Sequence, residues 1–154
     1  MKLQWKDKVQ KNAQALCNFL ADELSLASIK IRPNWQQCLD ETLFVFNQDK
    51  LDELNIEFET PTETDPDKYL TGYFITIAPE PALLIGETYV VYIRNRDQTG
   101  KLRSIANRTR TLIHELVHLV MSTEYTRDEF CERIAHEFST KPKIVKGVKL
   151  ILKT

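Results

Sequence analysis

The sequence predicts an α+β fold, with helices at both ends of the chain and a small, mostly antiparallel sheet between them. Apolar residues recur at steps of three and four near the N-terminus and again after residue 104, and this spacing places them on one face of a helix. Between these regions, runs rich in β-branched and aromatic residues are typical of strands. A length of 154 residues is that of one domain, so a single domain over 1–154 is expected.

The N-terminal helix is expected over residues 2–24, where it packs over the core. Its apolar stripe consists of Val9, Ala13, Leu16, Phe19, Leu20 and Leu24. Turn residues and β-branched runs then predict a short helix or turn at 48–54, an acidic, solvated loop at 59–68, and strands at 28–32, 42–47, 69–78, 83–85 and 88–94.

The last third of the chain is expected to be helical. One helical pattern runs from residue 104 to about Met121. A capping box from Thr126 to Glu129 predicts the start of a second helix, which ends near Phe138. In the tail, 143–153, lysines alternate with Ile, Val and Leu, so a last strand or a partly ordered basic tail is expected.

Composition argues against several classes of protein. The chain has 21 basic and 22 acidic residues, and a net charge of −1 gives no general attraction to nucleic acid or anionic lipid. No window approaches the roughly 18 apolar residues of a membrane span, and residues 1–11 lack the apolar core of a signal peptide. Three scattered cysteines, Cys17, Cys38 and Cys131, do not resemble a disulfide framework, so an intracellular (cytoplasmic) location is expected.

One motif carries chemistry. Residues 114–118 read His-Glu-Leu-Val-His, an HExxH sequence in the middle of a strongly helical and apolar region. Residues four apart on a helix differ by about 40° in direction, so His114 and His118 can hold one Zn²⁺. Glu115 lies about 100° round the helix, where it can take a proton from a water molecule that the zinc activates. Burying these polar side chains on so apolar a helix would cost free energy if no metal ion bound them.

Catalytic zinc requires a third protein ligand and an open fourth position. On a helical wheel of the following helix, Glu132 lies at the border of the buried arc, and His136 lies about 40° farther out on the same side. The arc itself is formed by Phe130, Cys131, Ile134, Ala135 and Phe138. Glu132 is therefore the first candidate and His136 the second. If Glu132 is the ligand, His136 could hydrogen-bond a substrate or the ligating carboxylate.

The HExxH motif and residues 132–138 (ERIAHEF) together resemble the gluzincin pattern of HExxH followed by ExxAxxF. The closest likeness is to small metallopeptidases of the ImmA/IrrE type, over about residues 88–139. The resemblance implies a zincin-like fold, zinc held by His114, His118 and Glu132, and Glu115 as the general base. It also implies that a peptide substrate lies along the strand before the HExxH helix.

The function expected from these features is zinc-dependent hydrolysis of peptide bonds in a narrow protein substrate. Tyr125, before the second helix, is a candidate oxyanion donor or a loop aromatic packed on the core. Three alternatives stay open. The first is an SprT-like protease with three histidine ligands, the second is a non-enzymatic interaction protein that retains the zinc site, and the third is a hydrolase of another amide or ester.

Overall fold

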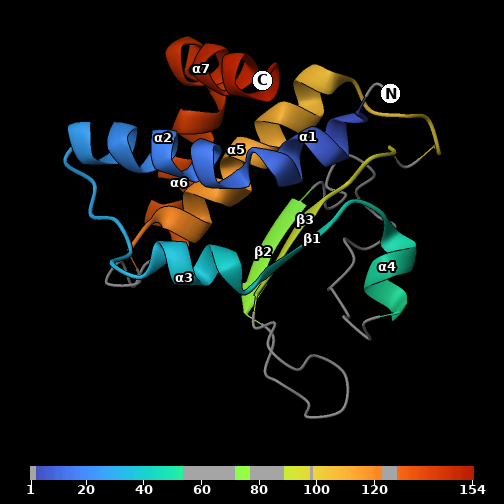
Figure 1. Ribbon diagram of the computed structural model, residues 1–154, viewed down its shortest axis with the longest axis horizontal. Helices are drawn as coiled ribbons and strands as arrows, with labels where there is room; N and C mark the ends of the chain where they lie inside the picture. Colours follow the sequence, from blue (N-terminus) through green and yellow to red (C-terminus); the bar gives the residue numbers. More distant parts are fainter. Residues whose placement is uncertain (1–2, 54–71, 77–88, 98, 123–127) are drawn as a thin grey trace.

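The computed structural model describes residues 3–53, 72–76, 89–97, 99–122 and 128–154, which form helices packed on a three-stranded sheet (Figure 1). The helices are α1 (Trp5–Lys11), α2 (Ala13–Leu26), α3 (Trp35–Asp40), α4 (Gln48–Glu53), α5 (Ile105–Val120), α6 (Asp128–Thr140) and α7 (Pro142–Leu152). The strands are β1 (Thr42–Val45), β2 (Gly72–Thr76) and β3 (Tyr89–Ile93). The predicted α+β class is therefore confirmed.

The sheet has the order β1-β3-β2, so β3 is its central strand. Strand β1 pairs parallel to β3, from Thr42 opposite Tyr89 to Val45 opposite Tyr92. Strand β2 pairs antiparallel to β3, from Gly72 opposite Ile93. The expected mostly antiparallel sheet is thus wrong for the described strands, because one of the two pairings is parallel. A parallel pair needs a long crossover rather than a hairpin, and alternation within a strand does not encode its partner.

The expected helix over 2–24 is two helices that meet at Asn12. The side-chain amide of Asn12 and its backbone N–H both donate to the carbonyl of Lys8, at 2.9 and 3.0 Å. A short polar side chain that bonds the backbone in this way offers an alternative to the continuous helical ladder. The apolar stripe runs across the break, which is why periodicity alone did not reveal it.

The other expected elements have mixed outcomes. The strand expected at 28–32 is absent, and Ile31 makes only an isolated bridge to Met121. Strands within 42–47, 69–78 and 88–94 are confirmed as β1, β2 and β3, and the segment 48–54 contains the helix α4. The loop at 59–68 and the strand at 83–85 lie outside the described residues.

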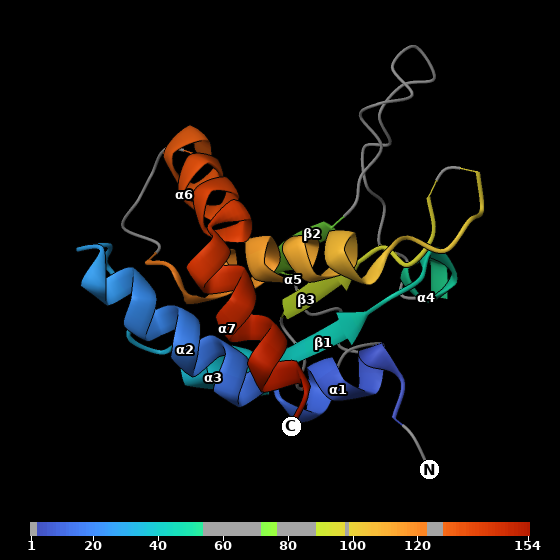
Figure 2. The same ribbon diagram turned by 90° about the horizontal axis from the view of Figure 1, so that it is seen from above.

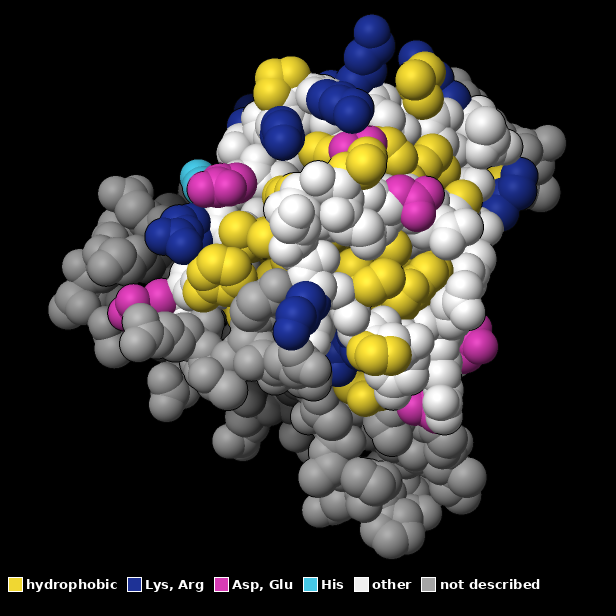
Figure 3. Space-filling model, turned by 90° about the vertical axis from the view of Figure 1, so that its left-hand side faces the viewer, with side chains coloured by type: hydrophobic (Ala, Val, Ile, Leu, Met, Phe, Trp, Pro, Cys, Tyr) yellow, Lys and Arg dark blue, Asp and Glu magenta, His cyan; other side chains and the backbone are white. Residues whose placement is uncertain are grey.

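The tail is a helix, not a strand or a basic tail. Helix α7 begins at Pro142, a residue favoured in the first turn, and buries Ile144, Val148 and Leu152. These three residues are four apart, a helical period that the alternation with lysine hides. The lysines are exposed, and Figure 3 shows basic side chains gathered at the top of the molecule, where α7 lies.

Helix α5 lies at the centre of the core. It packs against β2 and β3 on one side and against α2, α6 and α7 around it (Figure 2). Its most deeply buried apolar side chains are Leu112, Ile113, Leu116, Val117, Leu119 and Val120. None of the described helices is long and apolar enough to cross a membrane.

Candidate metal centre

Helix α5 presents the HExxH motif at the edge of the core. The hydroxyl of Ser104 accepts a hydrogen bond from the N–H of Asn107 at 3.1 Å and so caps the start of this helix. The helix expected from residue 104 to Met121 is confirmed as Ile105–Val120. His114 and His118 lie at the border of its buried face, with 24% and 19% of their side chains exposed.

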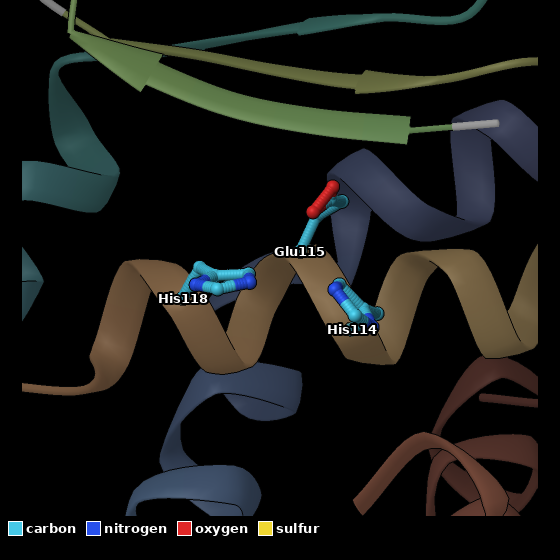
Figure 4. A group of neighbouring side chains, drawn as sticks. All are labelled: His114, Glu115 and His118. Carbon is cyan, nitrogen blue, oxygen red and sulfur yellow. The ribbon is translucent and has the colours of Figure 1, made fainter. Parts of the chain in front are cut away.

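The two histidines and Glu115 form one compact group. The imidazole centroids of His114 and His118 are 5.0 Å apart. One ligand atom from each of the three residues lies within 4.8 Å of the other two. In Figure 4 the imidazoles project from successive turns of α5, and the carboxylate of Glu115 points toward the sheet. The spacing of the motif therefore produces the cluster that it predicts.

Glu115 is a buried acid, with only 4% of the residue exposed. Burial raises its pKa well above the usual value, and the negative charge of Glu132 raises this pKa further. A carboxyl group with a raised pKa accepts a proton more readily than one in water. This property suits a general base.

Glu132 on α6 meets both histidines with one carboxylate. Its Oε2 lies 3.1 Å from Nε2 of His114, and its Oε1 lies 2.7 Å from Nε2 of His118. Burial lowers the pKa of His114, although the charge of Glu132 acts in the opposite direction. The lowered pKa favours the neutral imidazole at pH 7, which is the form that binds metal ions.

A divalent cation fits this set of donor atoms. Nε2 of His118 is buried and has no hydrogen-bond partner among the described residues, although Oε1 of Glu132 lies 2.7 Å away as an ion-pair contact. In a tetrahedral zinc site, bonds of about 2.0–2.1 Å place ligand atoms roughly 3.3 Å apart. The observed separation of 3.1 Å between Glu132 and His114 is close to this value, and the separation of 2.7 Å between Glu132 and His118 is shorter. A bound cation would give the buried nitrogen a coordination partner, whereas the described residues supply it no hydrogen-bond partner.

The remaining candidates take different positions. His136 is exposed on α6, and its charge lowers the pKa of His114, so it lies near the cluster. Tyr125 lies outside the described residues. The structure therefore brings together His114, Glu115, His118 and Glu132, with His136 beside them.

The strand that precedes the HExxH helix does not lie at the edge of the sheet. We expected this strand, β3, to offer its edge to a peptide, but it is paired on both sides. In the described sheet β2 is an outer strand, and Figure 4 shows it running past α5 on the side to which Glu115 points. Strand β2 precedes β3 in the sequence but pairs with the side of β3 that faces away from β1. The order of strands along the chain therefore did not reveal this arrangement.

Sequence reasoning missed one residue at the site, Arg32. Its Nε donates to the carbonyl of Leu119 at 2.8 Å, and its Nη2 donates to the carbonyl of His118 at 3.4 Å. These contacts span 87 and 86 residues of sequence, so no local pattern could have indicated them.

No protein-family model, curated protein or solved structure matches this chain in comparisons with known proteins. Function is therefore inferred from the chemistry of the cluster itself.

Proposed function

We propose that this protein is a zinc-dependent metallopeptidase of the gluzincin type, a single zincin-like domain that hydrolyses peptide bonds in a narrow protein substrate. One observation carries the proposal: the carboxylate of Glu132 faces both imidazoles of an HExxH helix. This is the arrangement that a site with two histidines and one glutamate requires.

Nε2 of His114, Nε2 of His118 and the carboxylate of Glu132 would hold the metal. When bound, zinc supplies Lewis-acid chemistry, which polarises a carbonyl group and lowers the pKa of water. Glu115 accepts a proton from the attacking water and delivers it to the nitrogen of the leaving amine. Its burial supports this role because a raised pKa lets it hold the proton between these two steps.

The buried carboxyl group also favours an enzyme over a non-enzymatic zinc protein. A site that only holds a metal needs no general base, and burying a carboxyl group costs free energy. Glu115 is nevertheless 4% exposed on a helix whose neighbouring buried residues are apolar. The contacts of Glu132 with both histidines favour the glutamate site over a site with three histidines.

The substrate would lie along β2. In the described sheet this strand is paired only with β3, so its other edge can add a peptide as a further strand. Backbone hydrogen bonds of this kind hold the peptide extended. The scissile bond would then lie beside Glu115, which points toward the sheet (Figure 4).

The test measures zinc content and peptidase activity together. Protein purified without chelators should contain about one zinc per chain. Glu115→Gln should keep the zinc and lose hydrolysis, because an amide cannot accept the proton. His114→Ala and His118→Ala should lose both.

The matched control is Glu137→Gln, which makes the same chemical change at an exposed position of α6 and should keep both properties. Folded wild-type protein that takes up no zinc on titration would contradict the proposal. Loss of zinc from Glu115→Gln as readily as from the histidine variants would contradict the roles assigned.

A further inference from the structure

The C-terminal end of α5 is held by a distant part of the chain. The last four carbonyl groups of a helix have no partner within it. In α5 the first of these carbonyls, that of Val117, accepts from the N–H of Met121 at 2.8 Å. Arg32 supplies donors to the other three.

Each of the three carbonyls accepts from a different nitrogen of Arg32. The backbone N–H donates to Val120 at 2.7 Å, Nε donates to Leu119 at 2.8 Å, and Nη2 donates to His118 at 3.4 Å. The guanidinium group also places a positive charge at the negative end of the helix dipole, which is a favourable position. One residue, through its backbone N–H and its side chain, thus completes the turn that carries His118.

The neighbours of Arg32 hold the chain where it leaves the helix. The N–H of Ser122 donates to the carbonyl of Lys30 at 3.0 Å, and Ile31 forms a bridge with Met121. Residues 30–32 therefore fix both the last turn of α5 and the two residues after it. We call this set of contacts the Arg32 clamp.

We infer that Arg32 is a positioning residue for the metal centre, because the Arg32 clamp fixes the turn from which His118 reaches toward Glu132. This inference rests on the proposed function. Helix ends fray, and a metal site requires its ligands to be held to within about 0.5 Å. His118 is in the last turn of its helix, whereas Glu132 is on another helix, so an unrestrained last turn would separate the two.

The test compares variants by zinc affinity and by hydrogen exchange. Arg32→Ala keeps the backbone bond to Val120 and removes both side-chain bonds. It should bind zinc about tenfold more weakly, as is typical when a group that orients a ligand is lost. Competition with a chromophoric chelator measures this affinity. In metal-free protein, the amides of Met121 and Ser122 should exchange faster than those of the wild type.

Two further variants sharpen the comparison. Arg32→Lys keeps the charge but cannot reach both carbonyls, so its zinc affinity should lie between those of wild type and Arg32→Ala. Arg96→Ala is the matched control, because the Arg96 side chain also donates to a backbone carbonyl, that of Gly100 at 3.0 Å. It lies in a turn before α5, and its zinc affinity and exchange should stay unchanged.

Folded Arg32→Ala with the zinc affinity of wild type would overturn the inference, because a purely structural role would lower stability alone. If Arg32→Ala does not fold, Arg32→Lys becomes the deciding variant. Zinc affinity and amide exchange of Arg32→Lys that both match those of the wild type would overturn the inference. Absence of zinc binding by wild-type protein would instead contradict the proposed function. Hydrogen exchange in metal-free protein then still tests the Arg32 clamp.

Discussion

Nε2 of His118 lies 2.7 Å from Oε1 of Glu132, although the two residues belong to different helices. The other oxygen of the same carboxylate faces His114 at 3.1 Å. Glu132 is still 61% exposed, so its carboxylate is accessible from solvent as well as from the two imidazoles. This relationship distinguishes Glu132 from His136, one turn farther along α6, and the first prediction tests the distinction.

Glu132→Ala should weaken zinc binding by more than 100-fold, because it removes a ligand rather than a group that supports one. His136→Ala should weaken it by no more than 10–100-fold, the range for outer partners. Zinc affinity is measured by chelator competition on both variants. A greater loss in His136→Ala than in Glu132→Ala would point to a site with three histidines.

Glu115→Gln should change how stability depends on pH in metal-free protein. The folded-state pKa of Glu115 is raised above the ordinary 4.5, so the native state keeps a proton that the unfolded chain has released. Wild-type stability should therefore fall as pH rises from 4.5 toward the raised pKa, by at most about 1.4 kcal/mol per pH unit. A glutamine does not titrate and should lack this fall.

Urea midpoints of the two proteins across acidic and neutral pH measure the effect. The lowered pKa of His114 acts in the opposite direction, since a neutral buried histidine favours folding as pH rises. This contribution is present in both proteins, so their difference isolates Glu115. Parallel pH profiles would show that Glu115 has no raised pKa.

Gly147→Ala should destabilise the protein by about 1 kcal/mol. A methyl group at Gly147 would overlap the ring of Phe19, whose two Cε atoms would lie 2.8 and 2.9 Å away. Overpacking costs about 1–3 kcal/mol, and the better helix propensity of alanine offsets up to about 1 kcal/mol. In a Phe19→Ala background the same substitution should stabilise instead. Denaturant midpoints measure the effect of Gly147→Ala in each background. If the substitution also destabilised the Phe19→Ala protein, the ring of Phe19 would not be the obstacle.

Ser104→Ala should cost about 1 kcal/mol, because it leaves the N–H of Asn107 without its cap at the start of α5. Ser104→Gly should cost only a few tenths of a kcal/mol, since glycine is tolerated at this position. Thermal unfolding of the two variants measures the difference. Equal stabilities would indicate that the hydroxyl contributes nothing to α5.

Sequence reasoning predicted the elements whose signal is local. The HExxH helix was predicted because His114 and His118, four residues apart, lie among apolar residues with helical spacing. The apolar spacing of the following helix likewise placed Glu132 at the border of its buried face. The reliance on apolar periodicity also accounts for the errors in the helices. Alternating lysines hid the four-residue spacing of Ile144 and Val148 in α7, and the apolar stripe of the first helix continued past the break at Asn12.

Features that depend on distant pairing could not be predicted. Strand β1 lies parallel to β3, with β2 between them in sequence but outside β3 in the sheet. Nothing within Thr42–Val45 identifies that neighbour. The role of Arg32, which was expected to end a strand, was likewise hidden, because its contacts with the carbonyls of His118 and Leu119 involve the other half of the chain.

The span of the Arg32 clamp also bears on the order in which the protein folds. An excised peptide covering residues 104–122 would contain every residue of α5 but none of the three donors that Arg32 supplies to its last turn, so this turn would unravel. Ribosomes make Arg32 well before His118, because 86 residues separate them. The nascent N-terminal helices can thus be in place when the motif emerges, and the proposed metal centre would be complete only after that long-range contact forms.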